Sequence, residues 1–312
     1  MVITLKELLD AGADRLSIEL VWGEGYLDRP IEEKAINRPG LALTGFFQYF
    51  AHRRLQIFGL AEFTYLKSLK TVEREKNLRA ILEKNVPCII IARNRNPLPE
   101  LLALAEEYKT PLLRTTMITS RFINECTVLI EELTAPHGRI QGTMIDVMGI
   151  GVLLQGKAGI GKSEIALALI ERGYSLIADD VTEVVKNSRG RVMASANDLT
   201  RFHMEVRGVG IVHVPSLFGM GAIRRETELD VVINLHPYVN DADEDRTGIL
   251  PSEVEVLGVK FPYYTLPVSS GRDMANLVET TALNYKLKML GHDAAKELDE
   301  KVIGSFLSKS GE

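Results

Sequence analysis

The stretch GKAGIGKS, Gly156–Ser163, decides the fold of the second half of the chain. It matches the pattern G-x-x-x-x-G-K-[ST] at every fixed position. Glycines let successive backbone N–H groups point at one anion, and a helix that begins at Lys162 adds the positive end of its dipole. The expected nucleotide-binding residues are those of this loop: Gly156, Lys157, Ala158, Gly159, Ile160, Gly161, Lys162 and Ser163.

The segments on either side of the loop favour phosphate binding over a glycine turn without a ligand. The apolar segment GVLLQ precedes the loop and predicts a strand, and SEIALALIER follows it with the pattern of a helix that ends at Gly173. In such a strand–loop–helix unit Lys162 reaches the terminal phosphates, and the Ser163 hydroxyl is a ligand of Mg²⁺.

Two adjacent carboxylates, Asp179 and Asp180, end the next predicted strand, YSLIADD. Because a single helix connects this strand to GVLLQ, we expect the two strands to be parallel in one sheet, with both carboxylates at the edge that carries the loop. Neighbouring residues of a strand point to opposite faces, so one carboxylate is expected to orient Mg²⁺ or water and the other to accept a proton. The alternative is that the pair caps a turn.

Two more charged residues are candidates for the same site. Glu205 lies in the otherwise apolar segment FHMEVRGVGIVHVPSLFGMGAIRR and is a possible second ligand of Mg²⁺, which usually takes one or two carboxylates besides phosphate oxygens. Arg246 is the one cation of the acidic segment NDADEDRTG and could neutralise charge on a moving phosphoryl group. The alternatives are a local ion pair for Glu205 and a solvated turn for Arg246.

The length of 312 residues predicts two domains. A proline and two glycines interrupt the periodic pattern at EELTAPHGRIQG, so we place the boundary between residues 135 and 136. Residues 1–135 alternate between helical segments such as ITLKELLDAG and apolar strands such as RLQIFGL and VPCIIIA, which predicts a smaller α/β domain with a short parallel sheet.

This first domain shows no catalytic constellation. His52, Arg53 and Arg54 are expected to form a solvated helix face, and an anion site is the less favoured alternative. Cys88 lies in the apolar run VPCIIIA and is expected to be a buried, inert thiol; the only other cysteine is Cys126.

The composition is that of an ordinary soluble protein, with 46% hydrophobic and 25% charged residues. A formal net charge of −5 argues against a nucleic-acid partner bound by bulk electrostatics. The first residues carry charges and lack the apolar core of a signal peptide, and no run reaches membrane-spanning length. We therefore expect a cytoplasmic protein without a membrane partner.

Three segments, GKAGIGKS, RGYSLIADD and MEVRGVGIVHVPSLFG, together resemble the bifunctional HPr kinase/phosphorylase family of bacteria. The resemblance continues in the first half through INRPGLALTGFFQYFAHRRLQIFGLAEFTYL and to the end through GRDMANLVETTALNYKLKMLGHDAAKEL. It implies an enzyme that phosphorylates a regulatory serine of HPr, the phosphocarrier protein of the sugar phosphotransferase system. The donor is ATP or pyrophosphate with Mg²⁺, and the reverse reaction is a phosphorolysis that releases pyrophosphate.

The resemblance also implies a fold, an assembly and residue roles. The family has an α/β fold with a P-loop catalytic domain of mixed sheet, here residues 136–312, and it assembles as homo-hexamers. By motif, Lys162 and Ser163 fall on the phosphate and Mg²⁺ residues, Glu205 on the second Mg²⁺ ligand, Asp180 on the base for the serine hydroxyl, and Arg246 on the catalytic arginine.

The sequence departs from the family pattern at a catalytic His-Gly pair, where it has Gln141-Gly142. Glutamine donates a hydrogen bond but does not titrate near neutral pH, so we expect a slower enzyme whose rate lacks a histidine-like dependence on pH. A His-Gly pair four residues earlier, at His137, substitutes only if the segment shifts.

A second departure lies in LPVSSGRDMA, where Ser269 and Ser270 replace the arginine and proline of the family. The loss of a cation is expected to weaken binding of inorganic phosphate or phosphoserine more than binding of Mg-ATP, and so to impair phosphorolysis. Two other functions stay open: a kinase of this fold with another substrate, and a nucleotide-dependent sensor whose catalysis has decayed at Gln141.

Overall fold

The computed structural model describes residues 2–238, 252–269 and 271–298. The chain divides into two compact units, Met1–Ala135 and Pro136–Glu312, and each is described by itself. In the described part of the chain, none of the helices combines the length and the apolar character needed to cross a membrane.

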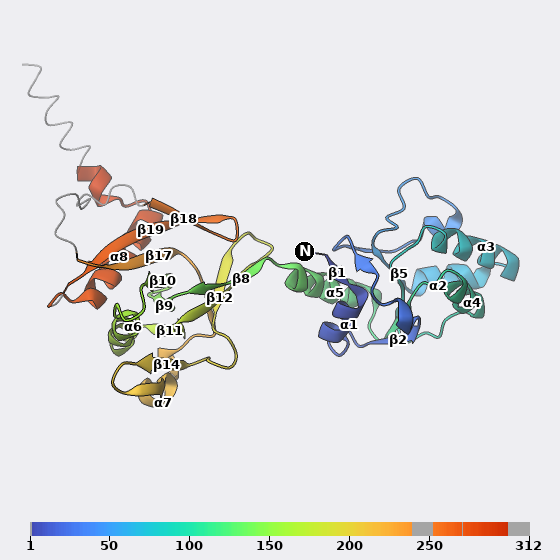
Figure 1. The fold of residues 1–312 in the computed structure, drawn as a ribbon. Helices are drawn as coiled ribbons and strands as arrows, with labels where there is room; N and C mark the ends of the chain where they lie inside the picture. The colour runs from blue at the N-terminus through green and yellow to red at the C-terminus, as the bar shows by residue number, and fades with distance from the viewer. Residues whose placement is uncertain (1, 239–251, 270, 299–312) are drawn as a thin grey trace, which may run out of the picture. The chain divides into compact units, whose positions relative to one another are not determined.

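Unit 1 is built on a five-stranded sheet that is mostly parallel (Figure 1). Its two central strands are buried on both faces, which explains why RLQIFGL and VPCIIIA read as continuous apolar runs. The predicted parallel sheet is confirmed for four strands, and the fifth, β2, is antiparallel to its neighbour. In spatial order the strands are β2 (Ile18–Trp22), β7 (Leu112–Thr115), β6 (Ile89–Ile91), β5 (Leu55–Phe58) and β4 (Ile36–Asn37).

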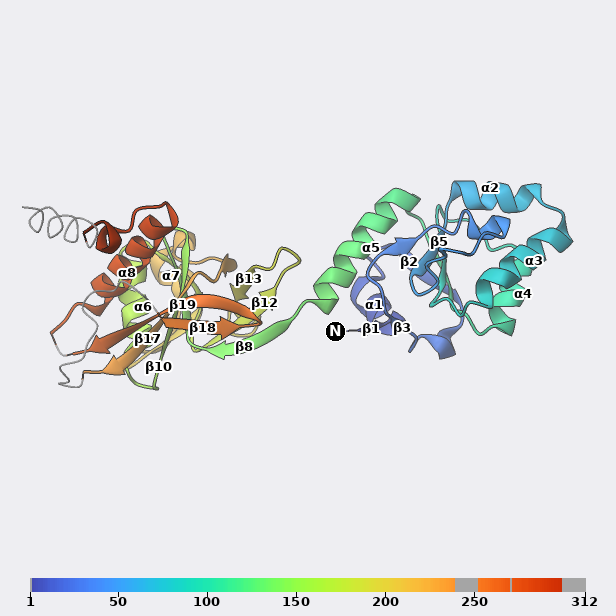
Figure 2. The same ribbon diagram turned by 90° about the horizontal axis from the view of Figure 1, so that it is seen from above.

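Helices cover both faces of this sheet (Figures 1 and 2). Neighbouring residues of β5 point to opposite faces of the sheet. Ile57 packs with α1 and α5, whereas Phe58 packs with α2, α3 and α4. The bounds are α1 (Leu5–Gly12), α2 (Leu60–Ser68), α3 (Thr71–Leu82), α4 (Pro99–Glu107) and α5 (Thr119–Thr134), with the short elements β1 (Ile3–Thr4), η1 (Glu24–Tyr26), β3 (Pro30–Ile31) and η2 (Ala42–Thr44).

The expectation of a helix face at His52, Arg53 and Arg54 is wrong, because these residues lie in turns that lead into β5. The physical reason is the buried side chain of Gln56. Its amide donates hydrogen bonds to the carbonyls of Ala51 and Arg54, at 2.9 and 2.7 Å, and the N–H of Arg54 donates to the carbonyl of Ala51 at 3.3 Å, so the segment is held as a turn rather than a helix.

Both cysteines are free and buried in unit 1, as the sequence predicts for Cys88. Burial raises the pKa of the Cys88 thiol well above its usual range and that of Cys126 to about 12. Since the thiolate is the reactive form, both side chains act as small apolar groups of the core.

Unit 2 contains a six-stranded mixed sheet in the order β11-β9-β10-β17-β19-β18. The strand β10 that carries the glycine loop is parallel to β17 and antiparallel to β9, and β11 is antiparallel to β9. Therefore β10 and β11 run in the same direction, as predicted, but β9 lies between them. The bounds are β9 (Thr143–Val147), β10 (Ile150–Gly156), β11 (Ser175–Ala178), β17 (Val231–Pro237), β18 (Ser252–Val256) and β19 (Val259–Val268).

This sheet is the middle layer of unit 2 (Figures 1 and 2). On one face Val152 and Leu154 pack with α6 (Lys162–Glu171) and α8 (Met274–Met289). On the other face Leu153 packs with a second sheet of four antiparallel strands. In spatial order these are β16 (Glu226–Glu228), β13 (Val192–Ser195), β12 (Val181–Lys186) and β8 (His137–Gln141).

A hairpin of β14 (His203–Val206) and β15 (Gly210–His213) follows, with α7 (Val214–Phe218) and η3 (Met220–Ala222). Met204 and Val206 pack into the core beside α6, while Glu205 between them is exposed. The alternation of a strand therefore turns the acid of this segment outward and anchors the hairpin through its neighbours.

Candidate functional site

The glycine loop connects the end of β10 to the start of α6. Gly156, Gly159 and Gly161 have φ of 147°, 77° and 106°, which only glycine adopts without strain. A Cβ on Gly156 would also lie 2.7 Å from the backbone oxygen of Leu235 on β17. The loop can therefore turn tightly against the sheet. Its N–H groups and the N-terminus of a ten-residue helix are then available to bind an anion.

Lys162 is buried in the first turn of α6. Its Nζ folds back over the loop and donates to the carbonyl of Gly156 at 3.2 Å. Among the described residues it has no carboxylate partner. An ammonium group that is buried without a counter-ion is costly, so an anionic ligand at the loop would stabilise it.

Asp179 is the point at which the elements around the loop meet. The hydroxyl of Ser163 donates to its two carboxylate oxygens at 3.2 and 3.3 Å, and that of Thr143 donates to Oδ1 at 2.8 Å. The backbone N–H of Glu205 donates to Oδ2 at 3.2 Å. One half-buried carboxylate thus joins α6, β9 and β14 at the mouth of the loop.

The oxygen atoms gathered here fit Mg²⁺ chemically. Hydroxyl and carboxylate oxygens are hard donors, and Ser163 and Asp179 offer both kinds beside the loop. In the described segments no three side chains of His, Cys, Asp or Glu form a cluster able to hold a metal. Mg²⁺ usually takes one or two carboxylates and completes its shell with water and phosphate oxygens.

From the sequence, Ser163 and Glu205 are predicted to be Mg²⁺ ligands, and Asp179 has no definite role. The structure brings Ser163 to Asp179, whereas Glu205 contacts Asp179 through its backbone N–H and has an exposed side chain. The adjacent acids at the end of YSLIADD were the available signal, but the partner Thr143 comes from a strand whose position the sequence did not reveal.

Asp180 occupies a strained turn beside Asp179. Its φ is 63°, and the N–H of Val181 donates to the carbonyl of Asp179 at 2.8 Å, which closes a three-residue turn. The carbonyl of Asp180 accepts from the N–H of Gly142 at 2.8 Å. A non-glycine residue in this region costs about 1–3 kcal/mol, and such strain clusters at functional sites.

The carboxylate of Asp180 is exposed and has no hydrogen bond or ion pair with any residue that the structure describes. Asp179, in contrast, is held by three donors, so one of the two adjacent carboxylates is fixed by its neighbours and the other is not.

Gln141 lies next to this turn. In the ladder of β8 and β12, Gln141 is opposite Val181, whereas His137 is opposite Val185. Four residues of strand separate Gln141 from His137 by about 13 Å. The register therefore puts glutamine, and not histidine, beside Asp180. Arg246 and Ser270 lie outside the described residues.

Arg207, to which sequence reasoning gave no role, also reaches the loop. A Cβ on Gly159 would lie 3.9 Å from Nη1 of Arg207, which belongs to the turn between β14 and β15. A pocket of about 340 Å³ beside the loop is lined by Gly161, Ser269 and Arg272 among others. The second departure from the family pattern thus borders the glycine loop.

Comparison with known proteins gives matches over both units. The family "HPr Serine kinase C-terminal domain" matches residues 132–302, and "HPr Serine kinase N terminus" matches residues 3–130. A protein of Leptospira biflexa named HPr kinase/phosphorylase is 41% identical over 299 residues, with 95% of this chain and 92% of the relative covered.

Further relatives carry the same name. That of Caldicellulosiruptor bescii is 38% identical over 278 residues, 89% of each chain, and that of Bacillus mycoides is 35% identical over 293 residues, 94% of this chain and 95% of the relative. The solved structure of the Hpr(Ser) kinase/phosphatase from Coxiella burnetii is 32% identical, covers 52% of this chain and 98% of its own, and has a TM-score of 0.47.

The position of Asp179 yields a test of metal binding. In Asp179→Asn the hydrogen bonds from Ser163 and Thr143 to Oδ1 keep an acceptor, but the negative charge and the acceptor for the N–H of Glu205 are lost. We expect the enhancement of ATP binding by Mg²⁺ to fall about 10-fold or more, while binding in EDTA is unchanged. Calorimetric titration with and without Mg²⁺ measures both, with the exposed Asp198→Asn as control. Equal enhancement in the two variants would contradict a role at the metal.

Proposed function

Because the chain belongs to the HPr serine kinase family, we propose that it phosphorylates a regulatory serine of the phosphocarrier protein HPr and reverses this reaction by phosphorolysis. The donor is ATP or pyrophosphate, and the biological role is regulation of the phosphotransferase system. The family match over both units and the names of relatives at 35–41% identity support the activity. The observation that carries the mechanism is the pair of unlike acids at the loop, one held and one free.

In this proposal the loop of unit 2 is a P-loop. Its N–H groups and Lys162 hold the phosphates, and Ser163, Asp179 and Glu205 hold Mg²⁺. When bound, Mg²⁺ supplies positive charge that stabilises the phosphate oxygens as charge develops on them.

The free carboxylate of Asp180 is the proposed general base. It accepts the hydroxyl proton while the serine oxygen forms a bond to the terminal phosphorus of the donor, and the bond from that phosphorus to its bridging oxygen breaks. In phosphorolysis an oxygen of inorganic phosphate attacks the phosphorus of phosphoserine and pyrophosphate forms. The bond from that phosphorus to the serine oxygen breaks, and the serine oxygen takes its proton back from Asp180. A positioned base contributes about 10²–10⁴ in rate, and an arginine such as Arg246 contributes about 10³–10⁵.

Family membership also supports three broader proposals. The protein assembles as a homo-hexamer, works in the cytoplasm, and acts without a nucleic-acid or membrane partner. Of the two competing functions, a kinase for another substrate keeps the same site. A sensor without catalysis has no need of a base, so the free carboxylate of Asp180 speaks for an enzyme.

The main test uses labelled ATP and HPr encoded by the same genome. We expect the label on a serine of HPr, and we expect Asp180→Asn to lose at least about 10² in transfer rate with ATP affinity near normal, because only proton acceptance is removed. Asp10→Asn, at an exposed carboxylate that likewise has no partner among the described residues, is the matched control. Transfer to other proteins but not to HPr would favour the second function, absence of transfer the sensor, and normal turnover of Asp180→Asn would remove that residue from its role.

The role of the glutamine next to the Asp180 turn can be tested through the dependence of the reaction rate on pH. Gln141→His adds a titratable group, so the variant is expected to turn over faster and to gain a limb in its pH–rate profile near neutral pH, which the unmodified protein lacks. His137→Ala is expected to leave the profile unchanged, since the register keeps His137 away from the turn. A collapse of activity in His137→Ala would show that the histidine had been assigned to the wrong position.

A substitution at Ser269 tests the balance between phosphorylation and phosphorolysis. Because Ser269 borders the pocket beside Gly161, Ser269→Arg returns a cation close to the loop. We expect it to raise phosphorolysis more than phosphorylation, measured as the ratio of pyrophosphate release to ATP-dependent transfer on the same HPr. An unchanged ratio would separate this position from the choice of direction.

A further inference from the structure

Unit 1 has a groove of about 720 Å³ at the carboxyl edge of its parallel strands. The groove opens where β5 passes into α2, where β6 passes into Arg93, and where β7 passes into α5. Ligands of open α/β sheets bind at this edge. Its polar lining consists of two arginines, four serine or threonine residues and a tyrosine: Arg38, Arg93, Thr64, Ser68, Thr119, Ser120 and Tyr65.

The two arginines differ in their partners. Arg38 pairs with the buried carboxylate of Glu62 at 3.1 Å, and that carboxylate also accepts from the N–H of Gly59 at 2.9 Å. Arg93 is exposed and makes no side-chain hydrogen bond or ion pair within residues 2–238, 252–269 and 271–298. No carboxylate lines the groove, so the charge of Arg93 is left for a ligand.

The backbone that presents Arg93 is strained and fixed. Arg93 and Asn94 both have positive φ, 63° and 52°, at roughly 1–2 kcal/mol per residue. Their N–H groups donate to the carbonyls of Met117 and Thr115 at 2.9 and 2.8 Å, which pins this turn to the segment before α5. Strain that is held in place in this way is typical of a binding site.

The starts of α2 and α5 meet in the same groove. A Cβ on Gly59 would lie 2.4 Å from Oγ1 of Thr119, so a side chain at residue 59 would displace the Thr119 hydroxyl. Two large apolar side chains, Leu60 and Ile118, stand at the groove and are 47% and 46% exposed. Together with the ring of Tyr65 they offer an apolar surface beside the hydroxyl groups and the free cation.

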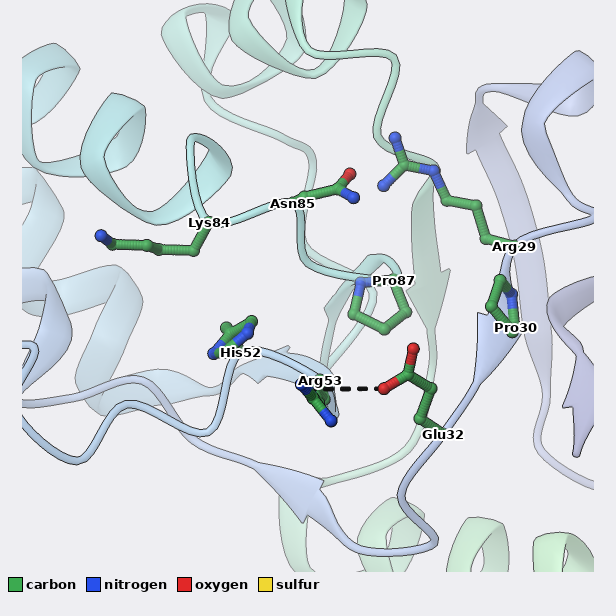
Figure 3. A pocket seen from close by; sticks show the side chains of 8 residues that line it. All are labelled: Arg29, Pro30, Glu32, His52, Arg53, Lys84, Asn85 and Pro87. Atoms are coloured by element: carbon green, nitrogen blue, oxygen red, sulfur yellow. Dashed lines mark ion pairs between the residues drawn. The ribbon is translucent and has the colours of Figure 1, made fainter.

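A second pocket, of about 270 Å³ and shown in Figure 3, lies at the opposite edge of the sheet, and its cations are already engaged. Arg29 donates to the carbonyls of Val86 and Tyr108 at 2.8 and 3.3 Å, and Arg53 pairs with Glu32 at 3.5 Å. Lys84 extends away from Arg29 (Figure 3), and its ammonium lies 5.8 Å from the ring of Phe47. This pocket is smaller and carries a carboxylate, so it is the less suitable anion site and serves as an internal control.

We propose that the groove of unit 1 binds a nucleoside 5′-monophosphate at a site separate from the glycine loop. Its phosphate pairs with Arg93, its sugar hydroxyls bond to Thr64 and Ser120, and its base covers Leu60, Ile118 and Tyr65. A volume of about 720 Å³ exceeds the needs of a phosphate ion and lies in the usual range for ligands of this size. The guanidinium of Arg93 favours the phosphate through charge-assisted hydrogen bonds.

The test follows hydrogen–deuterium exchange of the full chain by mass spectrometry, because peptides report on each site separately. AMP and UMP are the probes, with ribose 5-phosphate and inorganic phosphate as comparison compounds. We expect at least one nucleotide to slow exchange in residues 59–68 and 116–121, with a midpoint concentration at least about 10-fold lower than that of ribose 5-phosphate. Slower exchange in residues 156–163 would indicate binding at the glycine loop and is evaluated separately.

Two exposed cations of unit 1 give a matched pair of variants. Arg93→Gln is expected to raise the midpoint at residues 59–68 about 10-fold or more, and Lys84→Gln to change it less than 2-fold, with thermal unfolding unchanged in both. The proposal is overturned if neither nucleotide protects residues 59–68, if ribose 5-phosphate binds as tightly as the nucleotides, or if Lys84→Gln has the larger effect. If Arg93→Gln unfolds, Arg93→Lys replaces it, and an unchanged midpoint there with intact folding also overturns the proposal.

Discussion

The carboxylate of Asp179 is the interaction on which the site of unit 2 depends. It accepts hydrogen bonds from Ser163 at the start of α6, from Thr143 on β9 and from the backbone of Glu205 on β14. These donors come from three separate parts of the chain, so one charge aligns the helix that follows the glycine loop with the sheet and the hairpin. A half-buried carboxylate is stabilised by hydrogen-bond donors that replace water, and the hydrogen bonds also hold each donor in position.

The fixed position of Asp179 sets the chemistry of its neighbour. Because the chain must turn at once into β12, Asp180 adopts a positive φ, and its carbonyl is held by Gly142. Residue 180 is exposed and precedes Val181, the partner of Gln141 in the β8–β12 ladder. The same tight turn thus separates a carboxylate that is held by three donors from one that has no partner among the described residues, although the two are adjacent in sequence.

The two units share one geometric feature, the carboxyl edge of a set of parallel strands, but differ in what occupies it. In each, polar side chains gather where parallel strands end, because helix starts and loop N–H groups converge there. In unit 2 the glycine loop fills this edge, and the buried ammonium of Lys162 faces it. In unit 1 the edge is an open groove with a free arginine, whereas at the other edge Arg29 is bound to carbonyls and Arg53 to a carboxylate.

The sequence by itself determined the features that depend on local chemistry: the glycine loop, the helix after it, the buried strands and the burial of Cys88. It also indicated the family, because three specific segments occur in one order. Tertiary structure alone decided the insertion of β9 between β10 and β11, the donors to Asp179, and the turns at His52–Arg54 imposed by the buried Gln56. These contacts join residues far apart in the chain or depend on strand order and burial, and local periodicity carries no information about them.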